Sequence, residues 1–427
     1  RCDWSSDVCS SDLAYRRVPG WCYARRAGKY DAGHVALTAV EDAMSILLGL
    51  LDKTAGMMTG AELLAARAYL TLVYKHKGKD TDLSDDIAPY FLSLSYTDNL
   101  SNSADDVTLT LEDRAALWSH EWMPDRGAQL DVTIQTLNWD TLIEGLKTLP
   151  LGTFEIDEIE LSSLPSVVQI KGLSIIGTAQ LRGVEHNRAW ENVTLQKVCQ
   201  DIADANGLQL FYDCDDEIKL ERTEQNYQSD LEFLQKLCTD NGLALKVAAD
   251  KLIVFDEYKY ESADPVIIIR HPRMAAVPTQ QETAGQEQPQ PIIINKLESY
   301  RFKIKTRDVY KACHLKYQKG KDDAVIEATF TAPDKKDSDG LTLEISDQAD
   351  TIPEAERIAK KKLRDKNKEE ITGSMTMRGN LNLVAGVVVQ IEGFGQFDGK
   401  FIIVKATHDL SNGYTTSIDI RRCLNGY

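Results

Sequence analysis

Two stretches of this 427-residue chain share one pattern, and that pattern decides the expected fold. The first reads Gly127-Ala-Gln-Leu-Asp-Val132, then Leu151-Gly-Thr-Phe-Glu-Ile156, then Leu161-Ser162. The second reads Gly386-Val-Val-Val-Gln-Ile391, then Asp398-Gly-Lys-Phe-Ile-Ile403, then Leu410-Ser411. Both keep a glycine, an alternating strand, a turn, Gly-x-Phe-x-Ile and a polar turn in one order. We interpret them as parts of two related β domains; the alternative is that any two β-hairpins share this much.

Further alternating segments surround both stretches and extend the β pattern. In the first region, strands are expected at 69–74, 91–96, 105–111, 130–137, 154–161 and 166–172, with a short helical turn at 113–118. In the second, they are expected at 299–305, 312–317, 324–329, 387–391, 401–406 and 415–421, with a helix at 352–363. Six or so closely spaced strands indicate a closed or nearly closed barrel. The expected fold class is α+β, mainly β, with two related tube-like β-barrel domains.

The segment between these regions has a different period. Apolar residues at 195, 198, 199, 202 and 203 follow the helical repeat, and Asn206-Gly207 is a typical helix end. The same unit returns about 35 residues later, with Ser229 in the place of Thr194 as N-cap and Gly242 in the place of Gly207. Strands are expected at 208–212, 243–247 and 251–255. The segment is therefore an α/β insert with a tandem helix–strand repeat.

The N-terminal end of the expected domain plan includes doubtful sequence. Residues 2–13 match the translation of a sequencing-library adapter, so we exclude 1–13 from the fold. The basic, aperiodic segment 14–67 is doubtful, and the true start could be Met57 or Met58. The remaining plan is a first barrel at 68–190, the insert at 191–264, a linker or long loop at 265–294, and a second barrel at 295–427.

The overall charge limits the classes of partner. Acidic residues outnumber basic ones by 66 to 49, which gives a net charge of −17. Electrostatic wrapping of nucleic acid and adhesion to an anionic membrane both need clustered Lys and Arg, so both are disfavoured. No apolar run reaches the ~18–20 residues of a membrane span. Lys360-Lys361-Lys362 is expected to be a solvated helix face or a subunit contact.

We find no residues in this sequence that indicate catalysis, a cofactor or a metal. Cys199, Cys214, Cys238, Cys313 and Cys423 are too far apart for a zinc motif or a disulfide framework, which suits a reducing cytoplasm during synthesis. The acidic run 213–217 lacks the spacing of a calcium loop and is expected to be a solvated turn. The pair Asp105-Asp106 points to opposite faces of a strand, and 393–399 is expected to be a β-turn. Trp118, Trp122 and Trp139 are expected in a barrel core or subunit interface, with a sugar platform as the alternative.

These pieces together resemble a known family. The segment from Pro89 to Arg114 is similar to the N-terminal signature of the phage late control protein D family, whose members are baseplate hub proteins of contractile tails. Later similarities are Gly152-x-Phe-x-Ile-Asp-x-Ile, Ser229 to Leu237, and Ala385 to Gly399. The resemblance covers roughly 68–427, and the order of these degenerate motifs makes it specific.

The resemblance implies a structural, non-enzymatic role in the virion tail. Such hubs form a homotrimeric ring of two tube-like barrels per subunit, which adapts a hexameric tail tube to a trimeric central spike beside other baseplate proteins. DNA would pass through the channel without specific binding, and an acidic lining would suit that passage. Synthesis and assembly would take place in the bacterial host cytoplasm. The alternatives are a hub of a contractile injection or type VI-like machine, and a hub with peptidoglycan-hydrolase activity.

Overall fold

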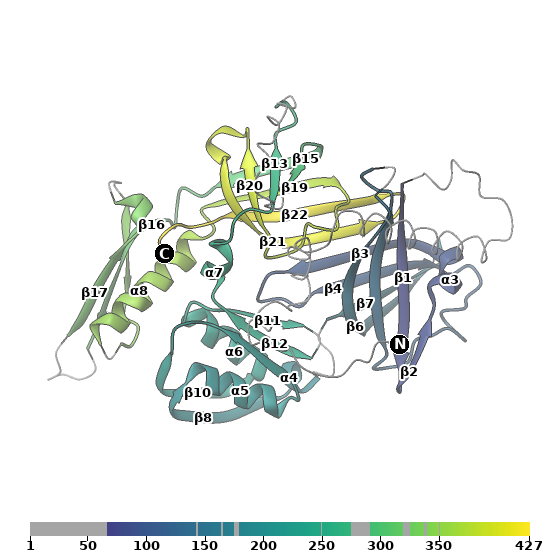
Figure 1. The fold of residues 1–427 in the computed structure, drawn as a ribbon. Helices are drawn as coiled ribbons and strands as arrows, with labels where there is room; N and C mark the ends of the chain where they lie inside the picture. The colour runs from purple at the N-terminus through teal and green to yellow at the C-terminus, as the bar shows by residue number, and fades with distance from the viewer. Residues whose placement is uncertain are drawn as a thin grey trace, which may run out of the picture. The chain divides into compact units, whose positions relative to one another are not determined.

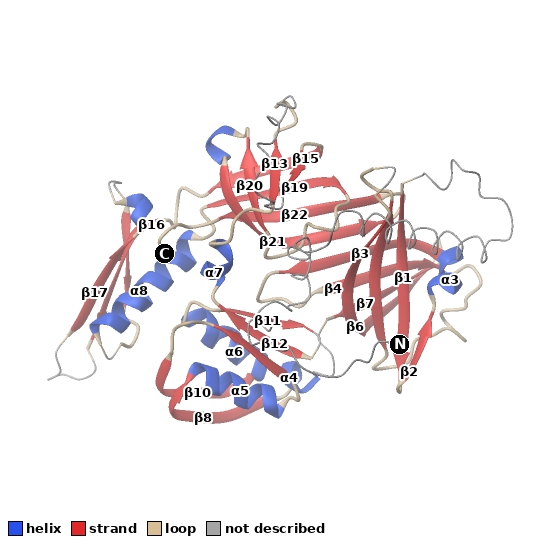
Figure 2. Ribbon diagram, viewed as in Figure 1, coloured by secondary structure: helices blue, strands red, loops and turns tan. Residues whose placement is uncertain are grey.

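The computed structural model describes residues 66–427, apart from 142–143, 164, 175–178, 249, 275–290, 319–324, 337–339 and 350. The expected adapter segment, almost all of the doubtful segment after it, and the centre of the expected linker lie outside these residues. Strands dominate the described fold, and the helices are few and mostly short (Figure 2). The fold is therefore α+β and mainly β, as expected.

The backbone divides into two compact units. One contains the described residues up to Thr71 together with Val132–Gly152, and the other contains Leu72–Asp131 and Thr153–Tyr427. In the first unit, the loop of a β-hairpin is closed by Asn138 and Gly145. The Asn138 amide donates to the Gly145 carbonyl, and the Gly145 amide donates to Asn138 Oδ1, both at 3.1 Å. All side-chain contacts described below lie within the second unit.

The first β region supplies the strands at the purple end of the colour scale (Figure 1). Its strands are β1 (Arg67–His76), β2 (Lys79–Asp82), β3 (Phe91–Asn99), β4 (Asp106–Glu112), β5 (Gln129–Leu137), β6 (Leu146–Ser162) and β7 (Val167–Leu173). Short helices α3 (Ser84–Ile87) and η2 (Ala88–Tyr90) precede β3. Five strands follow the order β5-β6-β7-β4-β3 in the sheet. Their alternating side chains form a core, in which Val107, Leu109 and Leu111 are buried.

The second β region repeats this order. Its strands are β13 (Ile267–Arg270), β14 (Ile292–Ile294), β15 (Leu297–Ile304), β19 (Ile371–Arg378), β20 (Val388–Glu392), β21 (Gly399–Leu410) and β22 (Tyr414–Arg422), and η4 (Gly395–Phe397) lies between β20 and β21. Five of them follow the order β20-β21-β22-β19-β15. In chain order, these five occupy the same places as β5, β6, β7, β4 and β3. The expectation of a linker or long loop at 265–294 is wrong for both of its described ends. These ends contain β13 and β14, which are strands of the large sheet.

The two regions also share their irregularities. The pairing of β6 with β7 shifts between Ile156 and Glu158, and that of β21 with β22 shifts between Ile403 and Lys405. A second matched shift occurs between Phe91 and Ser93 on β3 and between Leu297 and Ser299 on β15. Since a β-bulge is a local feature of backbone and sequence, two bulges in matching places indicate equivalent strands.

The Gly-x-Phe-x-Ile motif has one local structure in both regions. Gly152 and Gly399 both have positive φ, at 107° and 139°, a conformation that favours glycine. The Ile156 amide donates to the Ala128 carbonyl at 3.0 Å, and the equivalent Ile403 amide donates to Val387 at 2.9 Å. Phe154 and Phe401, between each glycine and isoleucine, are fully buried.

One strand pair joins the two regions into a single sheet. β3 pairs antiparallel with the end of β21, from Asn99 opposite Lys405 to Leu94 opposite Leu410. Among the described strands, the hydrogen-bonded order stays open and neither five-stranded set closes on itself. Closed barrels are therefore not observed in this part of the chain.

The insert between the regions contains the expected repeat and one strand more per unit. Its elements are α4 (Ala179–Gly183), β8 (Glu185–Thr194), α5 (Leu195–Ala205), β9 (Gln209–Asp213), β10 (Lys219–Ser229), α6 (Asp230–Asp240), β11 (Ala244–Ala248), β12 (Lys251–Phe255) and α7 (Glu257–Glu261). Thr194 and Ser229 are the N-caps, as expected, and Ser229 forms a capping box with Glu232. Sequence reasoning missed β8 and β10, which pair antiparallel, so the repeat is strand–helix–strand. β8 also crosses the expected boundary at residue 190.

The expected second barrel contains a separate small module. β16 (Tyr310–Tyr317), β17 (Ile326–Thr331) and β18 (Leu341–Ile345) form their own sheet, in the order β17-β16-β18. The short helix η3 (Pro333–Lys335) follows β17, and α8 (Ile352–Asn367) packs on the sheet. Three small or aliphatic residues of α8 (Ala355, Ala359 and Leu363) are buried there with residues of β16. The strands expected at 312–317 and 324–329 therefore do not belong to the large sheet.

The helical turn expected at 113–118 is also wrong. The segment forms turns, in which Ala116 has a positive φ of 53°. Asp113 accepts a hydrogen bond from the Trp118 amide at 3.2 Å. A short aspartate side chain can bind nearby backbone amides in this way and so competes with a helix.

Candidate functional site

The residues singled out from the sequence do not come together into one reactive site. The described residues include no group of three or more His, Cys, Asp or Glu that could hold a metal ion. No described helix is both long enough and apolar enough to cross a membrane. The five cysteines that lie within the described residues are free, and Cys199 and Cys238 are buried on their helices, as expected.

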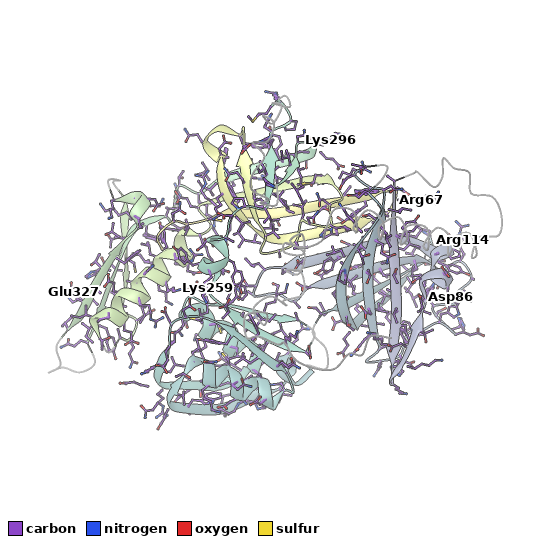
Figure 3. The ribbon with its side chains drawn as sticks, in the orientation of Figure 1. Arg67, Asp86, Arg114, Lys259, Lys296 and Glu327 are labelled. Atoms are coloured by element: carbon purple, nitrogen blue, oxygen red, sulfur yellow. The ribbon has the colours of Figure 1, made fainter. Side chains whose placement is uncertain are left out.

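Asp215, Asp216 and Glu217 of the acidic run 213–217 are exposed, as expected of a solvated turn, whereas Asp213 at its start is shielded from solvent. Lys259 of α7, labelled in Figure 3, binds Asp213 and Asp215, with each Nζ to Oδ1 distance at 2.6 Å. Burial lowers the pKa of this lysine, but the bonds to both carboxylates outweigh burial and raise it. The run therefore holds α7 against the end of β9.

Asp105 is buried just before β4 and belongs to a charge cluster, whereas Asp106 on β4 is half-buried. Lys246 of β11 places Nζ 2.8 Å from Asp98 Oδ1, 3.0 Å from Asp105 Oδ2 and 2.7 Å from the Asn99 carbonyl. Asp98 Oδ2 also accepts the Ala385 amide at 2.9 Å. Burial raises the pKa of Asp105 to about 7, and Lys246 opposes that rise. The cluster ties the insert to both β regions where β3 meets β21.

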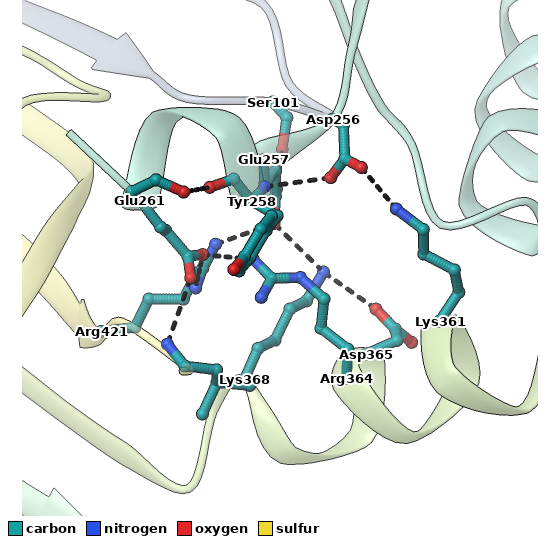
Figure 4. A network of polar contacts seen from close by, with 12 residues as sticks. Ser101, Asp256, Glu257, Tyr258, Glu261, Lys361, Arg364, Asp365, Lys368 and Arg421 are labelled. Carbon is teal, nitrogen blue, oxygen red and sulfur yellow. Dashed lines mark hydrogen bonds and ion pairs between the residues drawn. The ribbon is translucent and has the colours of Figure 1, made fainter. Parts of the chain in front are cut away.

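A second buried network surrounds α7, and we call it the α7 joint (Figure 4). Glu261 Oε1 lies 2.5 Å from both Arg364 Nη2 and Arg421 Nη1, and the Leu424 amide donates to Oε2 at 3.2 Å. Glu257 Oε2 lies 2.8 Å from Arg421 Nη2. Burial pushes the pKa of Glu257 upward, but Arg421 and neighbouring cations outweigh burial and lower it.

The joint connects three parts of the fold: the end of the insert, β22 and α8. Removing one partner of a buried ion pair leaves the other charge unpaired and lowers the folding stability by roughly 3–5 kcal/mol. The network therefore holds the three parts firmly in position relative to one another. The arrangement is suited to holding these three parts rigidly, because Glu257 and Glu261 of α7 are paired with Arg364 of α8 and Arg421 of β22.

The lysine run on α8 contributes to the same attachment, so it is not the fully solvated face that we expected, while the alternative of a subunit contact stays a prediction. Lys361 Nζ lies 2.5 Å from Asp256 Oδ2. Lys362 bonds Asp240 at 3.1 Å and Asp347 at 3.3 Å. Lys360 lies over the Tyr258 ring at 6.0 Å.

The expected turn at 393–399 does lie between β20 and β21, where it forms one side of an aromatic pocket. The pocket is lined by His271, Tyr300, Arg301, Phe302, Gly393, Phe394 and Phe397. Phe302 stacks on Phe397 with ring centroids 4.6 Å apart. Trp118 is buried and meets Trp122 edge to face at 5.4 Å, which agrees with a core position.

Among the described residues, β15 and the end of β6 are two of the exposed, unpaired sheet edges. β15 pairs only with β19, and Tyr300 and Ile304 on it are 48% and 45% exposed. The end of β6 pairs with β7 on one side. On its other side it extends beyond the first residue of β5, so this part of β6 has no neighbouring strand there among the described residues. Leu161 there is 44% exposed. Unpaired strand edges are ready to pair with another chain.

Solved structures of tail proteins share this fold. The 43 kDa tail protein of prophage MuSo2 from Shewanella oneidensis is 14% identical, with a TM-score of 0.56 over 83% of this chain and 98% of its own. The tail protein from Neisseria meningitidis MC58 is also 14% identical, with a TM-score of 0.57 over 83% of this chain and 97% of its own.

Sequence relatives lead to the same group. The "probable baseplate hub proteins" of Escherichia phages P2 and 186 are each 30% identical over 176 residues, which is 40% of this chain and 42% of each relative. The matched stretch is thus less than half of the length of these curated relatives. A family profile described as phage tail baseplate hub (GPD) matches residues 178–414, which is more than half of the chain. The chain therefore belongs to the phage tail baseplate hub (GPD) family.

Proposed function

We propose that this chain is the structural hub of a contractile phage tail baseplate. In this role it forms a homotrimeric ring that adapts the sixfold tail tube to the threefold central spike. The observation that carries the proposal is the repeated strand order, β5-β6-β7-β4-β3 and β20-β21-β22-β19-β15. Three chains with two equivalent sheets each present six similar units to a hexameric tube, yet remain threefold toward a spike.

The two equivalent sets of strands are, in this proposal, the two tube-like domains. β3–β7 form the first, and β15 with β19–β22 form the second; the α/β insert and the α8 module are additions between their strands. The sheet of an isolated chain is open, so tube closure would come from the neighbouring subunits. The buried α7 joint and the Lys246 cluster would keep the additions fixed while the ring bears load.

The proposed role is non-enzymatic and belongs to the virion. DNA would pass through the ring without specific binding, for which the net charge of −17 is favourable, because acidic walls do not hold phosphate. The other proposed partners are the tail tube, the spike and neighbouring baseplate proteins. A basic belt facing the channel in a structure of the ring would contradict the DNA part of this proposal.

The direct test is the mass of the full chain by light scattering after size exclusion, over a range of concentrations and with the spike protein added. We expect a trimer. A chain that stays monomeric at all concentrations and with its spike would overturn the proposed ring. Electron microscopy of particles would then separate a phage baseplate from the second candidate, an injection machine. That candidate is favoured by a fold match to a chain in the Francisella PdpA-VgrG complex, with a TM-score of 0.50 and 10% identity.

A further inference from the structure

The equivalence of the two β regions predicts which edges meet between subunits, and this inference rests on the proposed ring. Inside one chain, β3 of the first region pairs with the end of β21 of the second (Figure 1). β3 is equivalent to β15, and β21 is equivalent to β6. A ring built from equivalent units would repeat the same contact at each junction. We propose that β15 of one subunit pairs antiparallel with the end of β6 of the next copy of this chain.

The matched bulges fix the register on the β6 side. The shift at Ile156/Glu158 corresponds to that at Ile403/Lys405, so Glu158 takes the place of Lys405. Continuing along the strand, Leu161 takes the place of His408 and Ser163 that of Leu410.

The second pair of bulges fixes the register on the β15 side. The shift at Phe91/Ser93 corresponds to that at Leu297/Ser299, and the sheet neighbours agree with this alignment. Phe302 then takes the place of Tyr96, and Lys305 that of Asn99. In the chain itself, Lys405 lies opposite Asn99 and His408 lies opposite Tyr96.

Transferring these pairs to the exposed edges gives a complete inter-subunit register. The opposed residues are Glu158 with Lys305, Ile159 with Ile304, Glu160 with Lys303, Leu161 with Phe302, Ser162 with Arg301, and Ser163 with Tyr300. Opposed residues in an antiparallel pair project to the same face of the sheet. The proposed pair therefore has one charged face and one mainly apolar face. One face places two acids against two bases, and the other places aliphatic and aromatic residues together.

The charges on the two edges support this register independently of the bulges. The end of β6 carries three acids, Asp157, Glu158 and Glu160, whereas the facing edge carries Arg301, Lys303 and Lys305. Directly opposed unlike charges stabilise a strand pair, and like charges destabilise it.

The exposed side chains agree with the same arrangement. Leu161 and Ile304 are 44% and 45% exposed, and both fall on the apolar face of the proposed pair. Their equivalents are His408 and Asp98, which are buried where β3 pairs with β21 inside the chain; we call this contact the covered junction. Glu158 and Lys305 now hold partners in their own chain, Lys171 at 2.7 Å and Glu369 at 2.6 Å, on exposed surface where such pairs contribute little.

Charge swaps in the full chain test the pairing. The double variants Glu158→Lys/Glu160→Lys and Lys303→Glu/Lys305→Glu each put like charges opposite one another at the junction. We expect each to weaken trimer association about tenfold or more per contact, since two attractive pairs become repulsive. The quadruple variant combines both swaps, restores unlike charges at each position and should recover the trimer.

The control matched to Glu158→Lys/Glu160→Lys reverses two acids away from these edges, Glu121→Lys/Glu356→Lys, with the same change of net charge, and should leave the trimer intact. If the parent chain is trimeric but neither double variant weakens it, or the quadruple variant fails to recover while its circular dichroism stays native, the proposed pairing is wrong and the ring stands. If the parent chain itself never forms a trimer, the proposed function fails first.

Discussion

The covered junction between β3 and β21 and the exposed edges of β15 and β6 differ mainly in side-chain chemistry. Their backbones follow the same strand order and share the same bulges. At the covered junction, β3 and β21 bury Asp98, Tyr96 and His408, and the rings of Tyr96 and His408 stack at 6.0 Å. At the exposed edges, the equivalent positions hold Ile304, Phe302 and Leu161. A contact that forms during folding can contain buried polar networks, whereas one that forms later must stay soluble until a partner arrives. Exposed charges of opposite sign and a few apolar residues are suited to that second case.

The largest expected effect tests whether the two β regions are equivalent in energy as well as in order. Phe154→Ala and Phe401→Ala each remove a fully buried ring from the same motif position. Each should lower the free energy of unfolding by about 3–5 kcal/mol. Chemical denaturation of the two variants in parallel checks this, and a large loss for one beside a negligible loss for the other would break the equivalence.

The next effect concerns His408, which makes the covered junction sensitive to pH. Its Nδ1 lies 2.7 Å from the Tyr414 hydroxyl and its Nε2 lies 3.0 Å from the Leu383 carbonyl. Burial lowers its pKa from 6.5 to about 4. Because the pKa of His408 is lower in the folded state than in the unfolded state, the contribution of the neutral imidazole to folding stability is complete above about pH 6.5. This contribution is lost as the pH falls toward 4.

Over that window the loss should reach about 3 kcal/mol at most, from ~1.4 kcal/mol per pKa unit. Denaturation between pH 4 and 7 measures the slope, which His408→Gln should flatten because the amide does not titrate. The Leu161 position of β6 offers no titratable group, so Leu161→Gln is the control and should leave the slope unchanged. An unaltered slope in His408→Gln would refute the assignment.

A smaller loss is expected from Asp98→Asn. The amide keeps an oxygen for the Ala385 amide but removes one of the two charges that bind Lys246. Loss of a charged hydrogen bond costs about 2 kcal/mol. The control Asp157→Asn lies on the exposed end of β6 and should change the unfolding of an isolated chain by less than ~0.5 kcal/mol. Equal losses at both positions would mean that burial at the junction does not matter.

The smallest effect acts on association alone. Leu161→Thr removes apolar area that the proposed pair covers, which costs ~1 kcal/mol of burial. The dissociation constant of the trimer should therefore rise about fivefold per contact. Leu92→Thr is a matched control, because Leu92 is also 44% exposed but lies outside the proposed pair. Analytical ultracentrifugation measures both, and an equal effect of the two substitutions would contradict the assigned edge.

Local patterns predicted much of this fold. Thr194 and Ser229 could be assigned as N-caps, and Gly207 and Gly242 as helix ends, because capping depends on residues within one turn. The motif around Phe154 and Phe401 could be matched because glycines with positive φ leave a signature in the sequence.

Long-range pairing could not be predicted in the same way. Strands β8 and β10 lack strict apolar alternation, since their side chains are mostly exposed or half-buried, so the period-2 signal is absent. The separate sheet of β16, β17 and β18 has ordinary strand sequences, and only the tertiary structure shows that it leaves the large sheet. The charge clusters were missed because Lys246 and Asp98 are 148 residues apart, and no spacing rule links them.

Cysteine cross-linking between subunits tests the central claim, the β15–β6 register, most directly. Directly opposed Cβ atoms are about 4.5–5.5 Å apart in such a pair, and diagonal ones about 7–8 Å. In the proposed trimer, Leu161→Cys/Phe302→Cys should therefore form inter-subunit disulfides rapidly under mild oxidation, and Leu161→Cys/Ile304→Cys should form them slowly. Faster cross-linking of the second variant, or no cross-link in either from a trimeric sample, would contradict the account.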